Sequence, residues 1–130
     1  MKITGTFLDE ITHDIPANNW GREEWAQDFR VMRAIGIDTV ILIRAGCGRI
    51  ATYPSRVLER EVDIYPVYED LVDMFLSLAE ANEMAFFFGT YDSVSHTDQE
   101  RPLQEHLDLG RAFIDEAWAR YGEREAFKGW

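Results

Sequence analysis

Residues 38–44 read DTVILIR, a continuous apolar run between an aspartate and an arginine, and most of its members are β-branched or leucine. A run of this kind predicts a strand that is buried on both faces, as in a parallel sheet. The charge returns only at Arg44, so the sequence places a cation at the C-terminal end of a buried strand.

On either side of this run, strand-like and helix-like patterns alternate along the chain. Short β-rich runs begin near residues 3, 84 and 126, and apolar side chains recur every three or four positions between them. The helices are expected over about 22–35, 67–82 and 103–121, with Gly36 and Gly122 ending the first and the last. Their inward-facing stripes are expected to include Trp25, Phe29, Met32 and Ile35; Leu71, Phe75 and Leu78; and Leu107, Phe113 or Ile114, Trp118 and Tyr121.

This alternation predicts an α/β fold with about four parallel strands and three helices. A doubly wound nucleotide-binding sheet would carry a Gly-rich phosphate turn after its first strand, and the sequence has none there. A (βα)8 TIM barrel needs about 250 residues. The 130 residues are therefore interpreted as a single domain, 1–130, that forms a partial (βα)8 barrel.

The charge of the chain limits its partners. A formal net charge of -11 argues against binding of nucleic-acid phosphates and of anionic lipid. No apolar stretch approaches the roughly 18 residues of a membrane span. The N-terminal residues read as a strand and not as a signal peptide, which makes the cytoplasm the default location. A sugar, another neutral or cationic small molecule, or a protein remains as the partner.

Several segments together resemble the opening of a bacterial family of uncharacterised, glycosidase-like TIM-barrel proteins, the DUF4434 family. They are residues 5–10 (GTFLDE), Trp20, residues 24–25 (EW) and residues 35–41 (IGIDTVI). The resemblance runs the full length of the chain and implies that the chain corresponds to the first half of the family's barrel. It also implies that the general acid of related glycosidases, at the end of the fourth strand, lies just beyond Trp130. Hydrolytic activity is therefore not expected of this chain by itself.

Two adjacent carboxylates follow the first strand. Asp9 and Glu10 are expected to point to opposite faces, because successive side chains on a strand alternate, so they are not a catalytic pair by themselves. One of them either binds a sugar hydroxyl at the barrel mouth or serves only as a structural charge. Arg44 needs a carboxylate partner, for which Asp9, Glu10 and Asp92 are the candidates. It either orients such a carboxylate for function or ties the strand ends together.

Aromatic residues near the same rim are further candidates for sugar binding. Tyr91, with Asp92, leaves the third strand, and it either contacts a sugar or closes the core. Trp20 either offers a stacking platform or packs against the start of the first helix. Neither a metal nor a cofactor is expected, since Cys47 is the single cysteine and His13, beside Asp14, lacks a nearby ligand.

Two functions from different classes fit these observations. The first is a glycoside-hydrolase-like protein of which the chain holds the carbohydrate-binding half. The second is a non-catalytic module that binds carbohydrate or oligomerises. Because a half-barrel exposes an apolar inner face and two sheet edges, we expect it to pair with a second copy or with a second barrel half.

Overall fold

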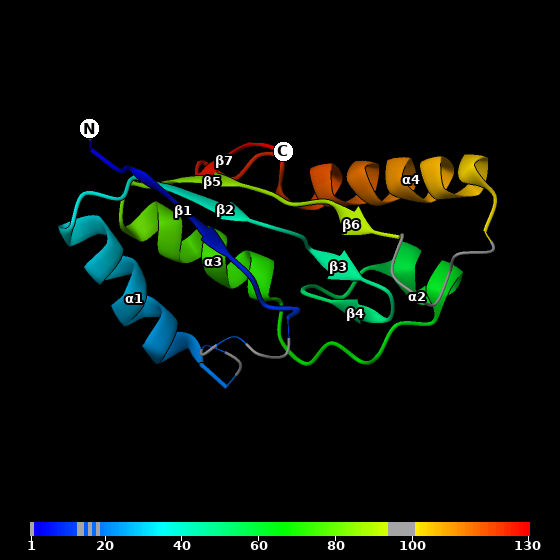
Figure 1. The fold of residues 1–130 in the computed structure, drawn as a ribbon, viewed down its shortest axis with the longest axis horizontal. Coiled ribbons are helices and arrows are strands. Elements are labelled where there is room, and N and C mark those ends of the chain that lie inside the picture. The colour runs from blue at the N-terminus through cyan, green and yellow to red at the C-terminus, as the bar shows by residue number, and fades with distance from the viewer. Residues whose placement is uncertain (1, 13–14, 16, 18, 94–100) are drawn as a thin grey trace.

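A parallel sheet with helices packed along one of its faces forms the body of the computed structural model, which describes residues 2–12, 15, 17, 19–93 and 101–130 (Figure 1). The elements are β1 (Gly5–Leu8), α1 (Arg22–Ala34), β2 (Thr39–Leu42), β3 (Gly46–Cys47), β4 (Ile50–Ala51), α2 (Arg56–Val62), α3 (Leu71–Ala81), β5 (Ala85–Phe87), β6 (Tyr91–Asp92), α4 (Leu103–Tyr121) and β7 (Phe127–Gly129). The main sheet has the order β1-β2-β5-β7, and every pairing in it is parallel. This α/β arrangement, with strands following chain order, is that of a partial barrel and confirms the predicted fold class.

A second, smaller sheet continues two of the main strands beyond their C-terminal ends. β3 follows β2 and β6 follows β5 along the chain, and these two short strands pair in parallel. β4 adds to β3 as an antiparallel neighbour. The sequence predicted only a loop here, because strands of two residues are too short to show a period. This small sheet brings the chain after Arg44 beside the chain after Gly89.

One helix was not predicted: α2 is a fourth helix, in addition to the three expected. It is short, and Leu58 is its one fully buried residue. A residue of another helix stabilises its first turn: the Glu116 carboxylate of α4 accepts hydrogen bonds from the backbone N–H groups of Arg56 (2.8 Å) and Val57 (3.4 Å). The Ser55 hydroxyl caps the same end by accepting from Leu58 N (3.1 Å). Tertiary contacts therefore stabilise α2 where periodicity gives no signal.

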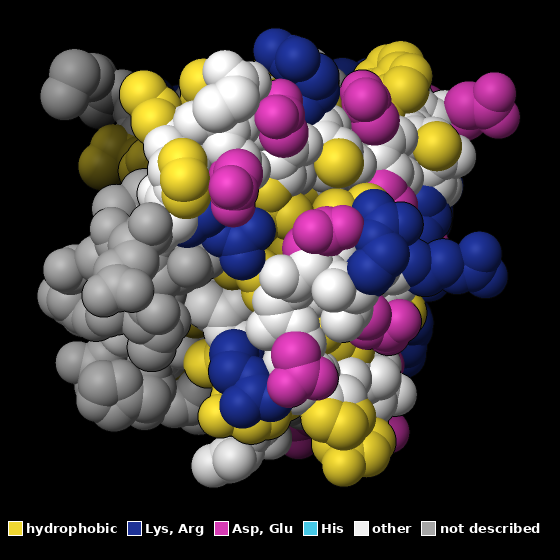
Figure 2. All heavy atoms as spheres, turned by 90° about the vertical axis from the view of Figure 1, so that its right-hand side faces the viewer, with side chains coloured by type: hydrophobic (Ala, Val, Ile, Leu, Met, Phe, Trp, Pro, Cys, Tyr) yellow, Lys and Arg dark blue, Asp and Glu magenta, His cyan; other side chains and the backbone are white. Residues whose placement is uncertain are grey.

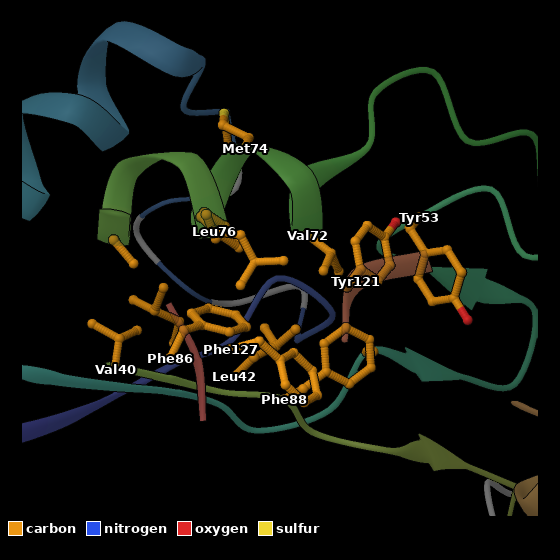
Figure 3. Close-up of a cluster of buried hydrophobic side chains, with 14 of the residues drawn as sticks. Val40, Leu42, Tyr53, Val72, Met74, Leu76, Phe86, Phe88, Tyr121 and Phe127 are labelled. Carbon is orange, nitrogen blue, oxygen red and sulfur yellow. The ribbon is translucent and has the colours of Figure 1, made fainter. Parts of the chain in front are cut away.

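The core lies between the main sheet and the helices. Figure 3 shows the side chains of Val40, Leu42 and Phe86 directed from the strands toward α3, where they meet Val72 and Leu76. All five side chains are fully buried. At about 25 cal/mol per Å² of apolar surface, such burial is the main stabilising contribution to the fold.

The prediction of an inward-facing side chain is wrong at three positions. Ile35 is 70% exposed because α1 ends one residue before it. Leu107 and Trp118 are 53% and 57% exposed. They lie off the buried face of α4, which is formed by Leu109, Phe113, Ala117 and Tyr121.

The other face of the sheet is uncovered. Phe7 of β1 is 65% exposed, and Ile43, just past β2, is 49% exposed. Ile41 and Phe87 are only partly buried. The prediction that residues 38–44 are buried on both faces therefore holds for the helix-covered face alone.

Candidate functional site

The ends of three strand segments meet at one cation. The Arg44 guanidinium lies 3.6 Å from the carboxylate of Asp9 (Nη2 to Oδ2) and 3.6 Å from that of Asp92 (Nη1 to Oδ2). Asp9 follows β1, Arg44 follows β2, and Asp92 ends β6. The expectation that Arg44 pairs with carboxylates at this rim is confirmed for Asp9 and Asp92, whereas the third candidate, Glu10, forms no ion pair with Arg44. We call Asp9, Thr12, Arg44, Cys47 and Asp92 the rim cluster.

Asp9 is held in place by the turn that follows it. Its carboxylate accepts hydrogen bonds from the backbone N–H groups of Ile11 (2.9 Å) and Thr12 (3.2 Å), and from the Thr12 hydroxyl. Arg44 donates to that hydroxyl oxygen as well (Nη2 to Oγ1, 2.9 Å). Burial by itself would raise the pKa of Asp9, but these hydrogen bonds and the Arg44 charge outweigh it, so the pKa lies below its ordinary value. Asp9 is therefore an ionised acceptor in a fixed orientation.

Glu10 behaves in the opposite way. Burial, and secondarily the negative charge of Asp9, raises the pKa of Glu10 to about 7. Its Oε1 atom is buried, with no hydrogen-bond partner among the described residues. Two neighbouring carboxyl groups thus differ in protonation near neutral pH. Such a separation is typical of sites that hold one carboxylate charged and keep a proton on another.

Cys47 belongs to the rim cluster, although no pattern in the sequence predicted it there. Its sulfur lies 3.8 Å from Asp92 Oδ2 and 3.9 Å from Arg44 Nη1. The pairing of β3 with β6 sets it opposite Asp92, and this pairing was not predicted. Thr12 was also missed, though its position three residues after Asp9 is typical of a side-chain turn.

Neither of the two aromatic candidates, Tyr91 and Trp20, belongs to the rim cluster. Tyr91 is 8% exposed, and its ring lies 6.0 Å from that of Phe113, while its hydroxyl donates to Gly48 O (2.9 Å). It therefore closes the core. The Trp20 ring packs edge-on against Trp25 at 4.9 Å and is 37% exposed. This contact fits the expected packing of Trp20 against the start of the first helix.

Hollows lie at both ends of the strands. One of about 360 Å³ opens near the rim and is lined by Gly48, Arg49, Arg60, Glu61, Val62, Asp63, Tyr91 and Arg101. Figure 2, which looks at this end of the molecule, shows basic and acidic side chains mixed over the surface there. Another hollow, of about 550 Å³, includes Asp38 and Met84, which precede β2 and β5, so it lies at the opposite end from the rim cluster.

No cluster of three or more histidine, cysteine, aspartate or glutamate side chains suited to a metal ion occurs within the described part of the chain. His13, Asp14 and His96 lie outside the described residues. Among the helices of the described ranges, none is long and apolar enough to cross a membrane.

Known proteins resemble this chain over almost its whole length. Residues 3–130 match the family model described as a domain of unknown function, DUF4434. A crystal structure from Bacteroides thetaiotaomicron VPI-5482, described as a "putative alpha-L-fucosidase", is similar at 49% sequence identity with a TM-score of 0.88. The match covers 99% of this chain and 40% of that one, so this chain spans less than half the length of the solved structure. No curated protein matches it.

Proposed function

Because the chain belongs to the DUF4434 family, and its fold is like that of the Bacteroides glycosidase-like protein, we propose that it is the carbohydrate-binding half of a glycoside-hydrolase-like barrel. The bound sugar would lie at the rim cluster. The observation that carries this proposal is the placement of Asp9, Arg44 and Asp92 together at the C-terminal ends of parallel strands. Barrel enzymes build their active sites at this end.

The chemistry of the rim cluster suits sugar hydroxyls. A carboxylate fixed by several donors accepts from a hydroxyl with little loss of side-chain entropy, and a guanidinium offers donors in a planar fork. Ile43, half-exposed next to Arg44, adds an apolar surface. A 6-deoxy sugar such as L-fucose presents both hydroxyls and a methyl group. We therefore propose an α-L-fucoside as the ligand class, in line with the description of the Bacteroides protein.

The proposal separates binding from hydrolysis. Glycoside hydrolysis requires two carboxyl groups on either side of the bond, about 5 to 9.5 Å apart. Asp9 and Asp92 both pair with Arg44, and Glu10 is next to Asp9 in the chain, so these carboxyl groups are grouped together and do not flank a bound sugar. We therefore expect this chain to bind the sugar without hydrolysing it.

The test is a titration of the isotope-labelled chain with L-fucose, followed by NMR. We expect amide shifts concentrated at residues 9–12, 44–47 and 92, and weaker shifts with L-galactose, which differs only by a hydroxyl at C6. Arg44→Met should weaken binding at least about tenfold, the loss of roughly one charge-assisted contact. Arg33→Met, at an exposed position in the last turn of α1 and away from the rim, is the matched control and should leave binding unchanged.

Three outcomes decide between the candidate functions. Absence of any localised shift at tens of millimolar sugar would reject the proposal. Localised binding with no release of nitrophenol from an aryl α-L-fucoside is the expected result. Turnover by this chain would show that its own carboxylates suffice, and would contradict both the binding-half proposal and the alternative of a non-catalytic module.

A further inference from the structure

The face of the main sheet opposite the helices carries a row of apolar side chains. Phe7 on β1 is in register with Ile41 on β2, and Ile41 is in register with Phe87 on β5. Ile43 extends this surface toward the rim and is 49% exposed. We call Phe7, Ile41, Ile43 and Phe87 the open face. Strands of parallel sheets are normally covered on both sides, so an uncovered row of this kind is unfavourable in water.

The sheet also has two edges. Within the described residues, β1 and β7 each have a strand neighbour on one side only. Both strands run in the same direction, since all pairings in the main sheet are parallel. The outer edge of β7 in one molecule can therefore pair in parallel with the outer edge of β1 in another.

We propose that a second copy of this chain covers the open face, and that the two copies close an eight-stranded barrel around a two-fold axis. In that arrangement β7 of each copy pairs with β1 of the other, which satisfies both edges at once. Twice four strands is the number that closes a (βα)8 barrel. These four strands have the curvature of part of a larger structure, since they match 40% of the solved structure with a TM-score of 0.88.

This pairing also affects the rim. All strand ends that carry the rim cluster point to one end of the barrel, so two copies would place two sets of Asp9, Glu10 and Arg44 around a single mouth. The inference on association does not depend on the proposed sugar ligand, and its test measures mass and not binding.

The experiment is sedimentation equilibrium of the full chain over micromolar to submillimolar concentration. We expect a mass of twice the 15.1 kDa of one chain. Phe7→Glu should weaken the pairing at least about tenfold, because it places a charge in an apolar contact. Tyr68→Glu makes the same kind of change at a side chain that is 97% exposed, away from the open face, and should leave the dimer intact.

Hydrogen exchange gives a second readout that a merely unfolded variant cannot imitate. Amides of residues 5–8 and 127–129 should become more protected as the concentration rises, while amides on the outer surface of α4 should not change. A chain that stays monomeric throughout, or that forms a trimer, overturns the proposal. A dimer that Phe7→Glu leaves intact also overturns it, because the contact would then lie elsewhere.

Discussion

Asp9 and Glu10 are neighbours in the chain, yet their surroundings move their pKa values in opposite directions. Burial dominates for Glu10, whereas donors from the following turn dominate for Asp9. The expectation that both residues lie on the first strand is wrong, because β1 ends at Leu8. Both lie in the turn that follows, whose N–H groups donate to Asp9, whereas Glu10 Oε1 is buried with no hydrogen-bond partner among the described residues. The two neighbouring residues can therefore provide an ionised carboxylate and a partly protonated one.

The raised pKa of Glu10 predicts that stability falls as the pH rises. Glu10 has an ordinary pKa of 4.5, and the fold raises it to about 7, so the folded state binds more protons than the unfolded state between these values. The free energy of unfolding should decrease from about pH 4.5 to about pH 7 because of this group. Urea denaturation at a series of pH values measures the dependence.

Glu10→Gln is the variant that isolates this effect, because its amide does not titrate. The decrease in stability between these pH values should be smaller in the variant than in the parent chain. Glu59→Gln, at an exposed position of α2, is the control and should keep the parent's dependence. An unchanged dependence in Glu10→Gln would mean that another group carries it.

At the level of single residues, the sequence could predict an ion pair where an unpaired charge would be energetically costly. A cation at the end of an apolar strand needs a carboxylate, and this reasoning found the partners of Arg44. It could not find Cys47, because the contact of its sulfur with Asp92 depends on the pairing of β3 with β6. It also left open whether Tyr91 faces a ligand or the core, since that depends on the position of Phe113.

Among the elements, β2 and the segment after β5 come unusually close. A Cβ atom at Gly89 would lie 2.2 Å from Leu42 O and 2.5 Å from the carbonyl carbon of Ile43. Both neighbours are backbone atoms, which cannot move aside without breaking the strand that leads to Arg44. A side chain at residue 89 would thus separate the two chain segments that form the rim.

Gly89→Ala should therefore destabilise the fold by about 1–3 kcal/mol, the usual cost of overpacking. Gly110→Ala is the matched control, because nothing lies within 4 Å of a Cβ atom there and the position is inside α4. That change should instead stabilise the chain by about 0.5–1 kcal/mol through helix propensity. Thermal unfolding of the two variants beside the parent compares them, and equal effects would contradict this account of Gly89.

Long periodic elements were predictable, and short ones that depend on tertiary contacts were not. The apolar run of β2 and the helical stripes between the strands predicted the alternation of strands and helices along the chain. α2 was missed because its first turn depends on Glu116, sixty residues away along the chain. The inward face of α4 was partly misjudged, because a helix with apolar residues on several sides does not indicate which side is buried.

For the whole molecule, the open face and the charge act against each other. Covering Phe7 and its neighbours favours association, whereas a net charge of -11 per chain opposes it. Two copies carry twice -11, or -22. Contact between the open faces is apolar, so added salt screens the repulsion and leaves the attraction in place.

The dimer should consequently become tighter with salt. Raising sodium chloride from about 0.02 M to about 0.2 M shortens the screening length from roughly 20 Å to less than 10 Å, and the dissociation constant should fall several-fold. Sedimentation equilibrium at each salt concentration measures the change. Phe7→Glu should respond to salt more steeply than the parent, because it adds a charge to each copy at the contact. A dissociation constant that rises with salt would mean that ion pairs hold the two copies together, and the open face would then not be the contact surface.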